Sequence, residues 1–289
     1  MRKPRAVEVM LLATVVLWAL NLTVSRYILL HGFQPLSYAT VRYGCAAAIF
    51  LVVARSLDIA RRDWWLVALA AVLLFLNQVS FVYALERTTA ATVGLILGSL
   101  PIFAGLIGLA VGLERLPGRF WLAATVSFAG VALVAVGSGN DLSGSLGGDL
   151  LGVATAATWA GYSVAIAPLM ARYSPLRISA VVLTLCWIGL LAVGLGQTAD
   201  QDFSLSWQVW ALFAFAVLGP LVVTNVLWYT ALHRVGPSRA TLAANLQPFV
   251  AAVFAVILLS ERISFVQVAG GVLIAAGIVL SRRRVRSTA

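Results

Sequence analysis

The sequence predicts an all-α polytopic membrane protein, in which ten transmembrane helices form two inverted five-helix repeats. Three observations support this prediction: the composition, the number of long apolar stretches and an internal duplication. Of the 289 residues, 62% are hydrophobic and only 10% are charged, whereas soluble domains are about 45–50% apolar and about 25% charged. The composition therefore argues against a water-soluble enzyme.

Ten apolar stretches approach the length of about 20 residues that a helix needs to cross a bilayer. They cover residues 7–27, 35–53, 64–84, 90–113, 120–136, 149–170, 176–195, 207–232, 239–259 and 265–280. The first stretch is too long for the apolar part of a cleaved signal peptide, and no small-residue cleavage site interrupts it. We therefore expect it to remain as the first span.

Apart from Arg42, the charges lie outside these stretches or near their ends, and they predict how the chain is oriented. A net charge of +10 suggests nucleic acid in a soluble protein, but here we expect the lipid bilayer as partner and no nucleic acid. An even number of spans puts both tails on one side, and that side holds Arg2, Lys3, Arg5, Arg55, Arg61, Arg62, Arg115, Arg119, Arg172, Arg177, Arg234, Arg239, Arg282, Arg283, Arg284 and Arg286. The other side holds Arg26, Arg87 and Arg262. Cations concentrate in cytoplasmic loops, so we expect a bacterial inner-membrane protein with both termini in the cytoplasm.

An internal duplication relates the two halves. With an offset of 147 residues, the stretch 84–87 recurs at 231–234, Pro101 maps onto Pro248, and 114–115 maps onto 261–262. Near the start of each half, an offset of 141 pairs Trp18 with Trp159. Five spans per repeat is an odd number, so the second repeat enters the membrane from the opposite side. We expect repeats at 1–137 and 149–289, joined by an external linker at 138–148, with a substrate site between them.

The duplicated signature resembles a known family. Pro101 lies thirteen residues before Glu114-Arg115, a glycine-bearing apolar helix follows, and the pattern repeats at Pro248. This is similar to the drug/metabolite transporter superfamily, EamA type, and most similar to the YddG-like amino-acid exporters. The resemblance implies ten helices and outward transport of aromatic and other neutral amino acids, sometimes with cationic aromatic drugs.

Polar and aromatic side chains deep in the spans are the candidate substrate-binding groups, because polar groups there usually face a cavity or another helix. They are Trp18, Asn21, Asn77, Gln78, Ser99, Trp159, Tyr162, Ser163, Asn225, Asn245 and Gln247, with Thr224 beside them. Trp18 and Trp159 either wall or gate the substrate site, or fill the interface between the halves as packing. Tyr83 and Tyr229 lie nearer helix ends, where we expect interfacial positions.

Three further residues are candidates for a role in the transport mechanism. Pro101 and Pro248 interrupt their spans, so each is predicted to kink its helix as a gating hinge; close packing of small residues is the alternative for the first. Arg42, the charge well inside a span, either holds a substrate carboxylate through a bidentate hydrogen bond or serves as a structural arginine. We expect ion pairs that cap turns and helix ends at Glu114-Arg115 and at 261–262, with salt bridges of a gate as the alternative.

The remaining observations limit the classes of substrate and activity that the sequence supports. No aspartate or glutamate lies within a span interior, so a neutral or zwitterionic substrate fits better than a free cation. No catalytic, phosphate-binding or metal-binding motif is present, so we expect no enzyme activity, cofactor or metal. The predicted function is alternating-access export, as a monomer, of small neutral amino acids and related metabolites, either aromatic or threonine-like. The alternative is a multidrug exporter of aromatic cations.

Overall fold

The computed structural model describes residues 3–88, 90–137, 145–250, 253 and 264–282, and within these ranges it is helical, with no strand. Seven of the described helical stretches are long and apolar enough to cross a membrane: Ala6–Leu30, Pro35–Val53, Arg61–Arg87, Thr92–Ala110, Leu146–Met170, Pro175–Ala199 and Trp207–Val235. Two shorter apolar helices cover Gly118–Val134 and Phe265–Ser281. The protein is therefore a multi-pass helical membrane protein.

The helices follow one another through short connections. The first half contains α1 (Lys3–Leu30), α2 (Pro35–Val53), η1 (Arg61–Asp63), α3 (Trp64–Arg87), α4 (Ala90–Leu97), α5 (Leu100–Ala110) and α6 (Gly118–Gly137). The second contains α7 (Leu146–Met170), α8 (Pro175–Ala199), α9 (Trp207–Val217), the π-helical turn η2 (Leu218–Val223), α10 (Thr224–Val235), α11 (Pro237–Ala244) and α13 (Phe265–Arg282). Of the predicted ninth stretch, 239–259, residues 251–252 and 254–259 lie outside the described residues.

The second half begins earlier than the hydropathy pattern predicts. The hydroxyl of Ser145 accepts a hydrogen bond from the backbone amide of Gly148 at 3.0 Å and caps α7. Serine is a favoured N-cap because its oxygen satisfies an amide that has no partner within the helix. Residues 146–148 of the predicted linker are therefore helical, and 138–144 lie outside the described residues.

The predicted fourth span is broken rather than merely kinked. α4 ends at Leu97, α5 begins at Leu100, and Pro101 occupies the first turn of α5. Proline is tolerated in a first turn because the amide that it lacks has no partner there anyway. In the second half, α11 ends at Ala244 and helical structure resumes at Gln247, immediately before Pro248. With the 147-residue offset the two breaks coincide.

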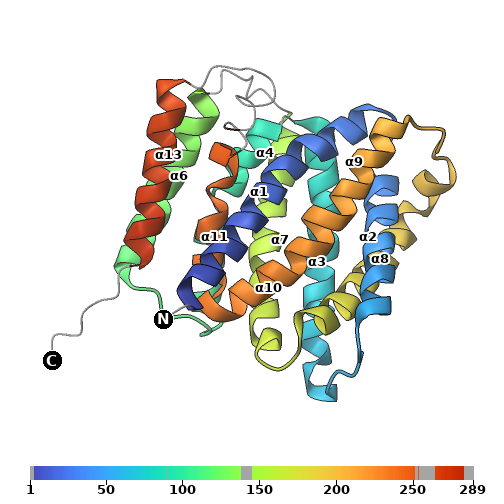
Figure 1. The fold of residues 1–289 in the computed structure, drawn as a ribbon, viewed down its shortest axis with the longest axis horizontal. Coiled ribbons are helices and arrows are strands. Elements are labelled where there is room, and N and C mark those ends of the chain that lie inside the picture. The colour runs from blue at the N-terminus through green and yellow to red at the C-terminus, as the bar shows by residue number, and fades with distance from the viewer. Residues whose placement is uncertain (1–2, 89, 138–144, 251–252, 254–263, 283–289) are drawn as a thin grey trace.

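Helices from the first half pair with helices from the second. α1 packs along α9 and α10, α2 along α8, α3 along α7, and α6 along α13, which stands with α6 at one side of the bundle (Figure 1). The α6–α13 crossing is very close: a Cβ added to Gly130 would lie 2.6 Å from the carbonyl oxygen of Gly270. One added to Gly277 would lie 2.7 Å from that of Ala123. These paired positions show that the two helices run antiparallel.

Candidate functional site

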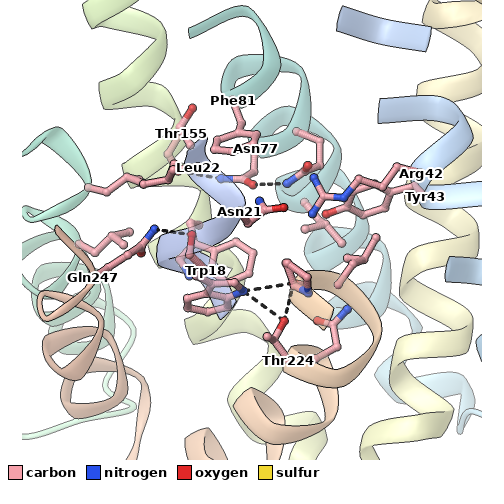
Figure 2. Close-up of a pocket in the computed structure, with 18 residues that line it drawn as sticks. Trp18, Asn21, Leu22, Arg42, Tyr43, Asn77, Phe81, Thr155, Thr224 and Gln247 are labelled. Atoms are coloured by element: carbon pink, nitrogen blue, oxygen red, sulfur yellow. Dashed lines mark hydrogen bonds between the residues drawn. The ribbon is translucent and has the colours of Figure 1, made fainter. Parts of the chain in front are cut away.

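A cavity of about 90 Å³ lies among helices of both halves. Its walls come from α1, α2, α3, the α4–α5 break, α7, η2, α10 and the segment after α11 (Figure 2). The lining residues are Trp18, Asn21, Leu22, Arg42, Tyr43, Leu74, Asn77, Gln78, Phe81, Leu97, Leu100, Thr155, Trp159, Pro220, Leu221, Thr224, Asn225 and Gln247. Within the part of the chain that the structure describes, this lining contains no aspartate or glutamate and one formal charge, that of Arg42.

The cavity brings together most of the polar residues that the sequence singles out. Those that line it are Trp18, Asn21, Arg42, Asn77, Gln78, Trp159, Thr224, Asn225 and Gln247. They come from spans far apart in the chain, and the packing of the first half against the second places them around one space. Pro101 and Pro248 lie beside helix breaks and do not line the cavity.

Four predicted binding residues lie elsewhere. The hydroxyl of Ser99 donates to the carbonyl of Ile96 at 2.6 Å, which satisfies it within its own turn. The amide of Asn245 donates to the hydroxyl of Ser127 at 3.0 Å, so it joins the α11 end to α6. Tyr162 and Ser163 are buried in α7 outside the lining. Polarity within a span predicts that a side chain has a protein or ligand partner, but it does not predict which.

The predicted interfacial position of Tyr229 is wrong. The sequence predicts it at the membrane interface, but it is fully buried, and its hydroxyl hydrogen-bonds to that of Tyr162. Tyr83, the other tyrosine predicted near a helix end, accepts a hydrogen bond from the side-chain amide of Gln197 at 3.1 Å. Its ring lies under the guanidinium of Arg87. Proximity to a helix end is misleading for Tyr229 because it lies on the face of α10 that is buried with Trp228 and Leu232, although the last turn itself is partly exposed.

The two repeat-related tryptophans meet at the cavity. The ring centroids of Trp18 and Trp159 are 5.3 Å apart with an edge-to-face arrangement, which is a favourable aromatic geometry. The indole nitrogen of Trp18 donates to the carbonyl of Pro220 at 3.2 Å and to the hydroxyl of Thr224 at 3.1 Å (Figure 2). The indole is therefore held in one orientation by η2 and by the first residue of α10, both in the opposite half.

Sequence reasoning missed Trp228, which supports this pair. Its ring lies 4.9 Å from that of Trp18 and 6.3 Å from that of Trp159, and it is buried behind the cavity wall. The 147-residue offset relates Trp228 to Phe81, which itself lines the cavity. This aromatic pair at equivalent positions of the two halves is the sequence signal that could have identified Trp228 and Phe81 as residues of the site.

A chain of amides crosses the interface between α3 and α7. The amide nitrogen of Asn77 donates to the carbonyl of Thr155 at 2.8 Å, and that of Gln78 donates to the Asn77 oxygen at 2.7 Å (Figure 2). The same 147-residue offset relates this pair to Thr224 and Asn225, which also lie on the cavity wall. Each half therefore contributes two adjacent polar residues from corresponding spans. A further amide, on Gln247, donates to the Trp18 carbonyl at 3.1 Å.

Arg42 is buried at one end of this polar wall, with 4% of its surface exposed. Its guanidinium lies 5.5 Å from the ring centroid of Tyr38 and 5.9 Å from that of Tyr43, which is within cation–π range. Tyr38 is held in turn by a 2.8 Å hydrogen bond to Ser25. Within the described residues, no carboxylate forms an ion pair with Arg42. A membrane-buried cation of this kind is a functional candidate.

The fold and the cavity define a class: a multi-pass helical membrane protein with a polar chamber between its two halves. A sequence model described as the EamA-like transporter family matches residues 5–136 and again residues 146–283. The chain therefore belongs to the EamA-like transporter family.

Several similar proteins are named as transporters, which agrees with a function other than catalysis. An uncharacterized transporter of Synechocystis is 26% identical over 298 residues, covering 93% of this chain and 84% of that protein. The uncharacterized transporter YyaM of Bacillus subtilis is 24% identical, covering 88% and 86%. A probable terminal-alkyne amino-acid exporter of Streptantibioticus cattleyicolor is 27% identical, covering 95% and 92%. A solved crystal structure has a TM-score of 0.76 over 96% of both chains at 18% identity, which shows a shared fold.

Proposed function

We propose that this transporter exports small neutral amino acids and related metabolites, aromatic or threonine-like, as the YddG-like exporters do. The observation that carries the proposal is the cavity lining: among the described residues it offers amide, hydroxyl and aromatic groups from both halves, a single guanidinium, and no carboxylate. Amides and hydroxyls both donate and accept hydrogen bonds, so this lining suits a zwitterion better than an ion of one sign. The relative named as a probable amino-acid exporter, at 27% identity, is consistent with this substrate class.

The mechanism that we propose is alternating access between two inverted five-helix halves, with ten spans in all. Two features support it. The close α6–α13 contacts are symmetric, because the 147-residue offset maps Gly130 onto Gly277 and Ala123 onto Gly270. The helix breaks before Pro101 and Pro248 also correspond, and discontinuous helices beside a central site are typical of transporters with inverted repeats. Each break is a hinge at which the two parts of a span can move relative to each other.

We further propose that the protein lies in the bacterial inner membrane as a monomer with both termini in the cytoplasm. Contacts between loops agree with the distribution of cations. Arg172 pairs with Asp63, and the backbone amide of Ser238 donates to Glu114, so loops assigned to the cytoplasmic side meet one another. On the other side, Arg26 donates to the carbonyls of Leu85 and Thr88.

The second candidate function is export of aromatic cations. The cluster of tryptophan rings at the cavity favours it, because aromatic faces attract cations. The guanidinium of Arg42 opposes it, since no carboxylate among the described lining residues compensates the repulsion between two cations. We therefore place this function second.

Counterflow in proteoliposomes tests the two functions. Purified protein is reconstituted with unlabelled phenylalanine or threonine inside, and uptake of the radiolabelled amino acid is followed. We expect transient accumulation above equilibrium for at least one of them, and none in protein-free liposomes. Saturable uptake of ethidium with no amino-acid counterflow would instead establish the second function.

A further inference from the structure

Three buried polar groups on the cavity wall have no hydrogen-bond partner among the described residues. They are the side-chain oxygen of Asn21, the side-chain oxygen of Gln78 and the Nε of Arg42. Each residue is more than nine-tenths buried, and all three line the same cavity. Buried polar groups are almost always paired in folded proteins, so three such groups around one space indicate a site for a polar ligand.

We propose that these groups bind the charged head of an α-amino acid. The guanidinium of Arg42 holds the carboxylate, and the side-chain oxygens of Asn21 and Gln78 accept hydrogen bonds from the ammonium. Two acceptors and one cationic donor match the two ends of a zwitterion in sign. This inference rests on the proposed function and assigns the residues that would recognise the substrate class.

The hydrogen-bond network fixes which end of the Gln78 amide is available to a ligand. The Thr155 carbonyl can only accept, so Asn77 must present its amide nitrogen there and its oxygen to Gln78. Gln78 must then present its own nitrogen to Asn77, which leaves its oxygen as the acceptor for a ligand. An acceptor held in this way costs little further ordering when an ammonium binds.

The surroundings of Arg42 leave its guanidinium available for a carboxylate. The Tyr38 and Tyr43 rings fix its position through their faces and, in the described part of the chain, no acidic side chain pairs with it. Figure 2 shows the guanidinium pointing to the side of the cavity on which Asn21 and Asn77 are drawn. The planar guanidinium presents several parallel donors, which is the geometry that a carboxylate prefers.

Both head groups should therefore be required for recognition. An amine without a carboxylate would bring a second cation next to Arg42. A carboxylate without an ammonium would bind Arg42 but leave the oxygens of Asn21 and Gln78 unpaired in a buried site. Trp18 and Trp159 would then contact the substrate side chain, because they form the aromatic part of the lining.

The test compares phenylalanine with its two incomplete analogues in proteoliposomes. Phenethylamine lacks the carboxylate and 3-phenylpropionate lacks the ammonium. Each is added as a competitor of labelled phenylalanine counterflow. For the wild-type protein we expect inhibition by unlabelled phenylalanine at concentrations at least tenfold lower than by either analogue.

Two variants should shift this selectivity in opposite directions. Arg42→Gln should raise the KM for phenylalanine at least tenfold and reduce the discrimination against phenethylamine. Gln78→Leu should reduce the discrimination against 3-phenylpropionate and leave that against phenethylamine unchanged. Arg42→Lys keeps the charge but not the planar donors, so it should raise the KM while phenethylamine is still rejected. A purely structural role for Arg42 would not change these ratios.

Arg26→Gln is the matched control, because Arg26 donates to two backbone carbonyls outside the cavity. It should leave the competitor ratios at their wild-type values, whatever its effect on protein yield. Wild-type KM and ratios in both Arg42→Lys and Gln78→Leu would overturn the head-group assignment while leaving the proposed function intact. Absence of amino-acid counterflow in the wild-type protein would overturn both.

Discussion

Glu114 accepts hydrogen bonds from both the backbone amide and the hydroxyl of Ser238, so it joins the loop after α5 to the first turn of α11. Within the described residues, no ion pair joins Glu114 to Arg115. The ion pair predicted at Glu114-Arg115 is therefore wrong, although Glu114 does cap a helix end. The pair predicted at 261–262 lies outside the described residues. At a helix N-terminus a carboxyl group satisfies free amides and, when ionised, complements the helix dipole.

The first prediction concerns the pH dependence of this contact. Burial raises the pKa of the Glu114 carboxyl, and the hydrogen bonds from Ser238 and the charge of Arg239 oppose the rise only in part. Because the pKa is raised in the folded state, the contribution of Glu114 to the free energy of unfolding is fully present below the ordinary glutamate pKa. That contribution is lost as the pH rises through the pKa of the folded state. Ionisation of Glu114 should therefore lower the thermal unfolding midpoint of the protein in detergent as the pH rises above about 4.5.

Glu114→Gln should remove that part of the pH dependence, because glutamine resembles the protonated acid. Ser238→Ala is the matched control: it removes a donor that favours the carboxylate form, so it should steepen the dependence. The measurement is the unfolding midpoint of each variant between about pH 4.5, the ordinary glutamate value, and neutral pH. Identical profiles for the wild-type protein and Glu114→Gln would contradict the assignment.

The second prediction concerns the close approach of α6 and α13. A Cβ at Gly130 would meet the Gly270 backbone at 2.6 Å, and backbone atoms cannot move aside as a flexible side chain can. Gly130→Ala should therefore destabilise the protein by about 1–3 kcal/mol, the usual cost of overpacking. Gly196→Ala in α8 is the control, since a Cβ added there would meet no atom of the described residues within 4 Å. Equal unfolding midpoints for the two variants would contradict this packing.

The sequence predicts the helical class and most helix positions because crossing the bilayer imposes a minimum apolar length. It predicts the breaks near Pro101 and Pro248 only as kinks. Whether a proline bends a helix or starts a new one depends on the residues before it, and here Gly98 and Ser99 separate α4 from α5. The early start of α7 follows from a single capping serine, a local signal that hydropathy does not detect.

The candidate site is predictable to the extent that polarity within a span marks a side chain that needs a partner. That reasoning identifies Trp18, Asn77 and Gln78, but it groups Asn245 with them, because a ligand and the Ser127 hydroxyl can each accept a hydrogen bond from an amide nitrogen. The amide chain to the Thr155 carbonyl is not predictable in this way, because it depends on the register of α3 against α7. Register follows from packing of side chains over the whole interface.

The third prediction concerns the tryptophans. Trp18→Ala and Trp159→Ala should each reduce amino-acid counterflow at least tenfold, a loss of ~1.4 kcal/mol, because both rings line the cavity and contact each other. Trp64→Ala is the control, since Trp64 is 43% exposed at the start of α3. Rates are compared at equal amounts of reconstituted protein. Wild-type rates in both cavity variants would show that these rings serve only in packing.

The fourth prediction concerns orientation in the membrane. Two exposed residues lie in loops that the cation distribution assigns to opposite sides: Leu57 after α2 and Ser204 after α8. In a background with Cys45→Ala and Cys186→Ala, a cysteine at position 204 should react with a membrane-impermeant maleimide in intact spheroplasts. A cysteine at position 57 should react only after the membrane is permeabilised, because cations accumulate on the cytoplasmic side and that loop carries Arg55, Arg61 and Arg62.

The other labelling patterns separate two errors in this topology. The reverse pattern would refute cytoplasmic termini but keep the two loops on opposite sides. Labelling of both positions from one side would refute the odd number of crossings that the ten-span topology places between the loop after α2 and the loop after α8. The inverted relation of the two halves would then fail with it, because an odd number of spans per repeat is what reverses the second half in the membrane.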